Sequence, residues 1–398
     1  MLKGNHSYFM KTLLINATAA RSSGALTILK DFLSYVYKSE ETKYHLHLLT
    51  TTEGIFHNSA NVTVHELPIQ NWSTRLLWDR SGFQKWCEQE SIIPDIVVSF
   101  QNTCPHLTGA YRDVKLLVYY HQPLPLVKYQ WKWHRSDERK LFMYAHFYRF
   151  FVNRWNRNAQ YAVQLPSVKD LFCRKFANIP PERVHVVRPN LPCIDTAVVP
   201  YKTISNSSKV FLFPATPLRY KNHAVILDAL KILKNEAPEA VEKLQVIFTV
   251  SSESFVAQTV FSMGLGSAVS CIGSISYEDL LSYYKSCDAL LFPSKIETFG
   301  LPLVEGAMFG LPVIAASLPY AREVLADYRD AVFADADDPA EWAEDIRQLV
   351  VGTKQIHTPL QGNAINTWSD FMGIAEEMTG TEVHCCIERH AKLCREMP

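Results

Sequence analysis

The stretch from Phe292 to Gly310 places two carboxylates around a turn that leads into a helix. An apolar run ends at Phe292, Gly300 permits a tight backbone path, and Pro302 suits the first helical turn. Glu297 lies in the loop, and Glu305 lies one turn into the expected helix, on the side that leans away from its apolar positions. Helix N-termini bind phosphate, and a carboxylate beside one accepts hydrogen bonds from a sugar diol. The pattern favours such a site, although two solvated glutamates on a plain connection remain an alternative.

A second loop, Pro214–His223, carries two cations between an apolar run and another expected helix. A departing diphosphate develops negative charge, and without a metal that charge must be met by Arg, Lys and helix N-termini. Arg219 and Lys221 are the candidates for this task. The alternative is that both simply solvate the loop.

Two features of the first half of the chain belong to the same type of site. A loop of small residues after the first apolar run contains Gly24, and His121 follows another apolar run. Ligands of open α/β sheets bind at the carboxyl ends of strands, which places His121 toward such a cleft. The alternative for an isolated histidine at a strand end is a structural role. No GxGxxG motif is present, which argues against a nicotinamide or flavin dinucleotide site.

Short apolar runs that alternate with helix-period stretches predict an α/β fold with parallel sheets covered by helices. The length of 398 residues favours two domains. A segment rich in Pro, Ser and Asn, residues 190–208, separates two series of expected strands and predicts the linker. The expected strands are Thr12–Asn16, His45–Leu49, Asp95–Ser99, Lys115–Tyr120 and Val184–Val187 in the first series, and Val210–Phe213, Gln245–Val250, Ala289–Phe292 and Pro312–Ala315 in the second.

The sequence from Phe292 to Gly310 resembles the signature of the group 1 (family 4) glycosyltransferases, in which seven residues separate two glutamates. The neighbouring Phe-Pro-Ser, Gly-Leu-Pro and Gly-Leu-Pro-Val motifs and Glu323 also match. The resemblance implies that Glu297 binds the transferred sugar and Glu305 the nucleotide ribose. It also implies catalytic roles for His121 and Lys221, while Thr216 stands where the family has an arginine, for which Arg219 is the expected substitute. The remaining expected donor-binding residues are Thr216, Thr298, Phe299, Gly300, Leu301 and Gly24.

The resemblance implies a GT-B architecture of two Rossmann-like domains that face a central cleft. We expect an acceptor-binding domain over residues 1–195, a nucleotide-sugar-binding domain over 196–367, and carboxy-terminal helices at 368–398 that pack back on the first domain. The implied reaction is sugar transfer with retention of anomeric configuration to a lipid-linked glycan hydroxyl, in polysaccharide biosynthesis of the O-antigen or capsule type. No metal and no cofactor are expected, and the Asp335-x-Asp337 sequence is interpreted as a turn. Alternatives are a catalytically silent GT-B module that binds a sugar nucleotide or protein partner, a sugar-nucleotide epimerase, and a sugar phosphatase.

The composition places the chain among ordinary globular proteins, with 47% apolar and 20% charged residues. Forty basic and forty acidic residues cancel, which argues against a nucleic-acid-coating protein. Nine scattered cysteines favour reduced thiols and a cytoplasmic location. Residues 128–157 are an exception, because eight cations, two acids and ten aromatics stand there together. This segment predicts contact with an anionic membrane surface, as in a peripheral protein of the cytoplasmic face of the inner membrane, with aromatics buried in the domain core as the alternative.

Overall fold

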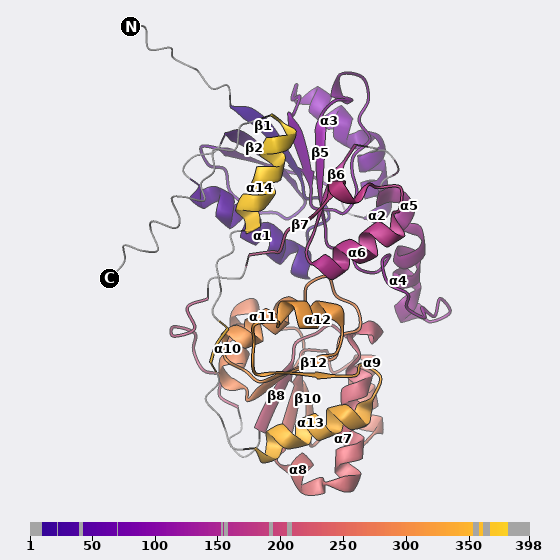
Figure 1. The fold of residues 1–398 in the computed structure, drawn as a ribbon, viewed down its shortest axis with the longest axis vertical. Helices are drawn as coiled ribbons and strands as arrows, with labels where there is room; N and C mark the ends of the chain where they lie inside the picture. The colour runs from indigo at the N-terminus through magenta and orange to yellow at the C-terminus, as the bar shows by residue number, and fades with distance from the viewer. Residues whose placement is uncertain are drawn as a thin grey trace.

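The computed structural model describes residues 10–21, 23–39, 43–69, 71–152, 154, 158–190, 194–204, 209–352, 358–360 and 367–380. Over these residues the chain forms two parallel β-sheets, each flanked by helices, and the two units lie end to end (Figure 1). The expected α/β class is confirmed. None of the helices described is long and apolar enough to cross a bilayer.

The first sheet has the strand order β3-β2-β1-β4-β5-β6-β7, and every pairing is parallel. Its strands are β1 Lys11–Asn16, β2 Tyr44–Thr50, β3 Val62–Glu66, β4 Ile96–Ser99, β5 Lys115–Tyr120, β6 Gln160–Val163 and β7 Val184–Val186. Its helices are α1 Ser23–Lys38, α2 Trp72–Leu77, α3 Phe83–Gln89, α4 Ser136–Phe147, α5 Arg149–Val152 and α6 Pro166–Lys175. A π-helical turn, Trp78–Gly82, joins α2 to α3.

The second sheet has the order β10-β9-β8-β11-β12-β13 and is likewise parallel throughout. Its strands are β8 Lys209–Phe213, β9 Leu244–Phe248, β10 Val269–Cys271, β11 Ala289–Phe292, β12 Val313–Ala316 and β13 Ala331–Ala334. Its helices are α7 His223–Glu236, α8 Pro238–Glu242, α9 Phe255–Ser262, α10 Tyr277–Ser286, α11 Leu301–Met308, α12 Pro319–Val324 and α13 Pro339–Val351. The central strand β11 is apolar and buried along its whole length, as a strand covered on both faces must be.

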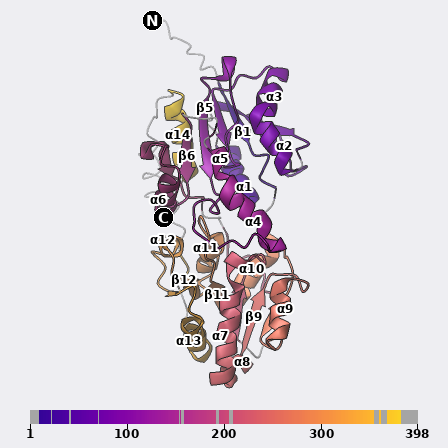
Figure 2. The same ribbon diagram turned by 90° about the vertical axis from the view of Figure 1, so that its right-hand side faces the viewer.

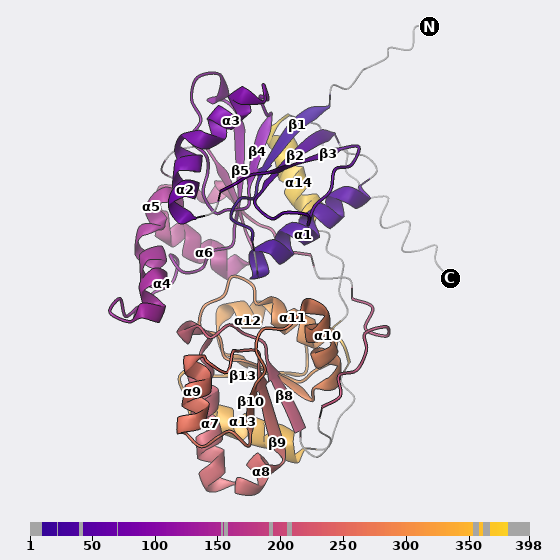
Figure 3. The ribbon, with the colours of Figure 1, turned by 180° about the vertical axis from the view of Figure 1, so that it is seen from behind.

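The last described helix, α14 (Thr367–Met378), lies beside the first sheet rather than the second, in yellow near β1 and α1 in Figures 1 and 3. Trp368 and Phe371 are fully buried against Phe32 of α1, and the Trp368 indole donates to the Asp31 carboxylate at 2.6 Å. The side of this helix that carries both aromatics thus completes the core of the first unit. Residues 381–398 of the expected carboxy-terminal helices lie outside the described part of the chain.

The expected boundary at residues 195 and 196 falls between β7 and β8. Of the expected linker, residues 191–193 and 205–208 lie outside the described residues. The two units meet through α4 and α6 of the first and α12 and the loop after β8 of the second (Figure 2). At one such contact, the Ser167 N–H at the start of α6 donates to the Glu323 carboxylate at 3.1 Å.

Candidate active site at the β8 and β11 strand ends

Each sheet has one place where the chain reverses the direction in which it adds strands. In the second sheet β8 leads outward to β9 and β10, whereas β11 leads the other way to β12 and β13. In the first sheet the same reversal separates β1 from β4. Open α/β sheets bind ligands in the crevice at the carboxyl ends of the strands at this point. The loops after β8 and β11 are therefore the first place to look for a site.

The loop after β11 is shaped by Gly300, which has a left-handed backbone with φ 83° and caps α11. A Cβ atom at this position would come within 3.2 Å of Leu303 Cδ1 and 3.3 Å of Phe292 Cε1. Both the left-handed backbone and this crowding therefore disfavour a larger residue. The Tyr320 hydroxyl also donates to the Ser294 carbonyl at 2.6 Å. The loop thus delivers the N-terminus of α11, the positive end of the helix dipole, to the sheet edge.

The two loops touch each other through a backbone bond and an ion pair. The Lys295 N–H donates to the Tyr220 carbonyl at 2.8 Å, and Lys221 Nζ lies 2.5 Å from Glu297 Oε1. The Lys221 and Glu297 side chains are only 17% and 14% exposed. The structure therefore brings together the cation and the loop carboxylate that the sequence assigned to opposite ends of the donor site.

Glu305 corrects the expectation that it leans away from the core, because only 4% of it is exposed. Its Oε2 accepts from the Tyr284 hydroxyl at 2.9 Å and its Oε1 from the Tyr277 hydroxyl at 3.3 Å. The helical-wheel position was derived for a helix covered on one side, whereas α11 lies between the sheet and α10. Burial raises the pKa of Glu305, and the hydrogen bonds from both tyrosines lower it.

Arg219 does not join the Lys221–Glu297 pair but faces the first unit. Its Nε lies 2.7 Å from Asp137 Oδ2 on α4 and 3.5 Å from Glu138 Oε1, and its guanidinium covers the Phe255 ring at 4.4 Å. Thr216, which stands in the place of the family's arginine, is exposed. The expected substitution of one arginine for the other is therefore not assembled in this structure.

The other expected donor-binding residues differ in their surroundings. Thr298 and Phe299 are buried, and Leu301 begins α11. Gly24 lies in the first turn of α1, is exposed, and has no atom within 4 Å of where a Cβ would stand. Packing within the described chain therefore does not explain a glycine at position 24.

His121 follows β5 in the first unit and is held through its backbone. Its N–H donates to Asn102 Oδ1 at 2.5 Å, and Asn102 itself has a left-handed backbone with φ 65°. Burial lowers the pKa of His121 to about 4, so the imidazole is neutral at pH 7. Among the described residues no hydrogen-bond partner meets its buried Nδ1.

A buried polar cluster at the β1 and β4 reversal was not predicted. Asp79 is 3% exposed and accepts from Gln101 Nε2 at 2.6 Å and from the Thr103 hydroxyl at 2.5 Å. Gln101 accepts in turn from the Thr18 hydroxyl at 2.8 Å. Burial raises the pKa of Asp79 to about 7. The polar run Gln101-Asn102-Thr103 directly after an apolar strand was the available sequence signal.

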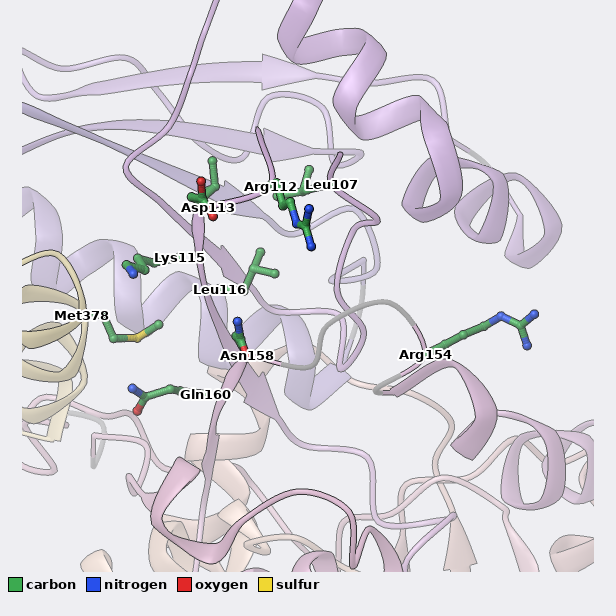
Figure 4. Close-up of a pocket in the computed structure, with 10 residues that line it drawn as sticks. Leu107, Arg112, Asp113, Lys115, Leu116, Arg154, Asn158, Gln160 and Met378 are labelled. Atoms are coloured by element: carbon green, nitrogen blue, oxygen red, sulfur yellow. The ribbon is translucent and has the colours of Figure 1, made fainter. Parts of the chain in front are cut away.

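A cavity of about 670 Å³ lies away from these loops, at the opposite end of the first sheet. Its lining includes Lys115 and Gln160, the first residues of β5 and β6, together with Met378 of α14. Figure 4 shows Arg154 extending away from Lys115 and Met378, so the charges of Arg154 and Lys115 do not converge. The acidic turn at Asp335–Asp338 also differs from a metal site, since Asp338 caps α13 and Lys295 pairs with Asp337. No group of three metal-ligating side chains is found within the described ranges.

Comparison with known proteins relates part of the chain to a family of glycosyltransferases. Residues 200–358 match the model of the glycosyl transferases group 1. D-inositol 3-phosphate glycosyltransferases are similar in sequence: that of Thermobispora bispora is 28% identical over 184 residues (43% of each chain), and that of Streptosporangium roseum 26% over 183 residues (43% of this chain and 42% of the relative). The matched stretches thus span less than half of these relatives.

Solved structures are similar over nearly the whole chain. A glycosyltransferase from Rickettsia africae has a TM-score of 0.63 at 15% identity, covering 94% of this chain and 99% of its own. WaaG, a glycosyltransferase involved in lipopolysaccharide biosynthesis, gives 0.63 at 15% and covers 94% and 96%. HepE of Anabaena, with UDP and glucose, gives 0.60 at 17% and covers 98% and 100%. The match to the glycosyl transferases group 1 thus covers residues 200–358, and the expected GT-B fold is confirmed.

Proposed function

We propose that this chain is a retaining, metal-independent glycosyltransferase that moves a sugar from a nucleotide-sugar to a hydroxyl of a lipid-linked glycan in polysaccharide biosynthesis. The observation that carries the proposal is the Lys221–Glu297 pair at the β8/β11 reversal, beside the N-terminus of α11. A shielded cation, the positive end of a helix and a nearby carboxylate match the diphosphate and the sugar of one ligand. The sequence relatives are named as D-inositol 3-phosphate glycosyltransferases, and WaaG is named as a glycosyltransferase of lipopolysaccharide biosynthesis. These names support the reaction class, sugar transfer, more than any particular acceptor.

In the proposed reaction the bond between the sugar's anomeric carbon and the diphosphate oxygen breaks while the acceptor oxygen bonds to that carbon on the same face. The acceptor's proton passes to an oxygen of the departing diphosphate. Lys221 and the α11 N-terminus stabilise the charge that develops on the diphosphate. Glu297 accepts hydrogen bonds from sugar hydroxyls, which requires it to release Lys221 to the phosphate. His121, neutral at pH 7, contacts the sugar from the other unit without adding charge.

Turnover with purified protein tests the proposal directly. UDP-, GDP- and dTDP-sugars are incubated with and without a glycan acceptor, and the UDP-sugars are tried first because HepE was solved with UDP and glucose. Release of nucleoside diphosphate, lost in K221A and E297Q, is the expected result. Binding of a nucleotide-sugar without turnover would favour a silent module, and a free epimerised sugar nucleotide an epimerase. Product analysis by mass spectrometry and NMR separates these outcomes and reports the anomeric configuration.

We also propose that the chain rests on an anionic membrane surface through residues 128–152 and 154, which belong to the expected basic and aromatic segment. Exposed apolar side chains and exposed cations occur together in α4, in α5 and in the loop before α4: Trp133, Met143, Phe147 and Phe150, with Lys128, Lys132, Arg139, Lys140 and Arg149. The alternative of burial in the domain core holds for Tyr148, whereas Trp131 is half-buried and packs with Tyr220 of the second unit. Arg157 and Trp155 lie outside the described residues.

Co-sedimentation with liposomes of anionic and of zwitterionic lipid tests the membrane contact. We expect binding to the anionic liposomes only, weakened when Lys128, Lys132 and Arg135 are replaced by glutamate and when salt is raised. Lys231→Glu on α7, an exposed cation of the second unit, is the control. Equal sedimentation of the triple variant and the wild type would refute the contact.

A further inference from the structure

Two tyrosines of α10 hold Glu305 by hydrogen bonds, and the position of Glu305 in the sequence motif does not predict these contacts. Tyr284 is fully buried and donates its hydroxyl to Oε2 at 2.9 Å. Tyr277 is 40% exposed and donates to Oε1 at 3.3 Å. The two tyrosines are seven residues apart, which places them two turns apart on one face of the helix. Each carboxylate oxygen thus has its own donor from the same helix.

This pair of contacts fixes the direction of the carboxylate. A buried carboxylate costs free energy unless hydrogen bonds satisfy it, and two donors on different oxygens also define its plane. An ionised carboxylate has about four acceptor positions, so both oxygens retain one for a further donor. Vicinal hydroxyls, which present two O–H groups side by side, match two such oxygens.

The position of Tyr277 indicates from which side that further donor comes. Tyr277 is the first residue of α10, and α10 follows the carboxyl end of β10. Tyr277 therefore reaches Glu305 from the sheet edge that also carries the Lys221–Glu297 pair. Tyr284 lies deeper on the same helix and closes the carboxylate from the inner side, fully buried and out of reach of a bound ligand.

We propose that Tyr284 and Tyr277 are positioning residues that aim the Glu305 carboxylate at the ribose diol of the nucleotide, and so set the preference for ribonucleotides over deoxyribonucleotides. The inference rests on the proposed nucleotide-sugar site. It assigns the ribose preference to a helix outside the Glu297–Glu305 motif. Neither tyrosine is proposed to touch the reacting atoms.

Binding of nucleoside diphosphates by calorimetry tests the proposal. The wild type, Y284F and Y277F are titrated with UDP, GDP and their 2′-deoxy counterparts. Loss of one hydroxyl donor to a charged group is expected to weaken ribonucleotide binding about tenfold in Y284F and less in Y277F, with binding of the deoxy compounds unchanged. The ribo-to-deoxy ratio therefore falls. Tyr283 lies on the same helix but its ring lies against Lys202, so Tyr283→Phe should keep the wild-type ribo-to-deoxy ratio.

The competing explanation is that the tyrosines only stabilise a buried carboxylate. In that case Y284F lowers the melting temperature while the ribo-to-deoxy ratio stays at the wild-type value, and this result overturns the inference alone. If Y284F does not fold, Y277F still tests the inference, because Tyr277 is partly exposed and its hydroxyl can be removed without opening the core. If the wild type binds none of the nucleoside diphosphates, the proposed function fails and the inference with it.

Discussion

The guanidinium of Arg219 and the carboxylate of Asp137 pair at 2.7 Å across the boundary between the two units. Arg219 lies two residues before Lys221 in the loop after β8, and Asp137 lies in the first turn of α4. Arg219, the expected substitute for the missing arginine at Thr216, is thus engaged by the opposite unit. A diphosphate bound at Lys221 and the Asp137 carboxylate would compete for the same cation.

This competition predicts opposite effects of changing the two partners. D137N leaves Arg219 with the longer contact to Glu138, at 3.5 Å, and is expected to tighten nucleoside diphosphate binding several-fold. R219A is expected to weaken it by about tenfold, the usual effect of losing one charge-assisted contact. Isothermal titration at two salt concentrations provides the measurement. Because both groups are about a third exposed, the pair itself contributes no more than about 1 kcal/mol to folding. Weaker binding in both variants would mean that the contact serves only the arrangement of the units.

The Lys221–Glu297 pair predicts the largest loss of turnover. Removing a preorganised group that stabilises developing charge costs about 10²–10³ in kcat, so K221A is expected to fall in this range. E297Q keeps the size of the side chain and loses the charge, and it should lower turnover while leaving nucleoside diphosphate binding near the wild-type value, since Glu297 is assigned to the sugar. Steady-state kinetics and diphosphate titration separate the two. Lys295→Ala, which removes the partner of Asp337 in the same loop, is the control.

Gly300 and Gly24 predict contrasting effects of the same substitution. G300A forces a Cβ into a left-handed position 3.2 Å from Leu303 Cδ1, and it should lower the free energy of unfolding by about 1–3 kcal/mol. G24A meets open space in a helical turn and should be neutral or stabilising by up to about 1 kcal/mol. Denaturant unfolding measures both. If substrates approach the backbone at Gly24 as the resemblance implies, G24A lowers turnover despite its stability, and unchanged turnover would refute that approach.

Local sequence patterns predicted the strands that carry the site, but they predicted the side-chain contacts of the site less well. Expected strands correspond to β1, β2, β4, β5, β7, β8, β9, β11 and β12, because buried parallel strands are continuous apolar runs. The strands β3, β6, β10 and β13 were missed. Three of them, β3, β10 and β13, lie at sheet edges and are only partly buried, so they lack the continuous apolar run of a central strand.

The side-chain contacts of the site could not be predicted where they join residues that are distant in the sequence. Arg219 and Asp137 stand 82 positions apart in different units, and no local pattern relates them. Glu305 was assigned an outward direction because its own helix gives only the angle to the sheet. The sequence of the covering helix α10 did contain a signal, however, because a spacing of seven residues places Tyr277 and Tyr284 on one face of a helix. A polar acceptor opposite two tyrosines on one helix face was thus a detectable signal.

His223, the first residue of α7, predicts a specific acid sensitivity. Its ring lies between Phe213 and Phe248, with centroids 4.5 and 5.0 Å away, and neither ring nitrogen has a hydrogen-bond partner in the described part of the chain. Burial, and secondarily the charge of Lys221, lowers the pKa of His223 to about 3. The unfolded chain, with a histidine pKa near 6.5, therefore binds this proton more strongly, and stability is lost as pH falls from about 6.5 toward 3.

Replacing His223 by leucine should remove this loss. Between pH 7 and pH 5 the decrease in the free energy of unfolding is expected to be about 2 kcal/mol smaller in H223L than in the wild type, following one proton taken up on unfolding. At pH 7 the variant should be as stable or up to about 3 kcal/mol more stable, because two unsatisfied polar atoms leave the core. Urea unfolding at a series of pH values gives both quantities. Leucine at the exposed His134 should leave the pH dependence as it is, and an H223L curve parallel to the wild type would show that His223 is not the group that titrates.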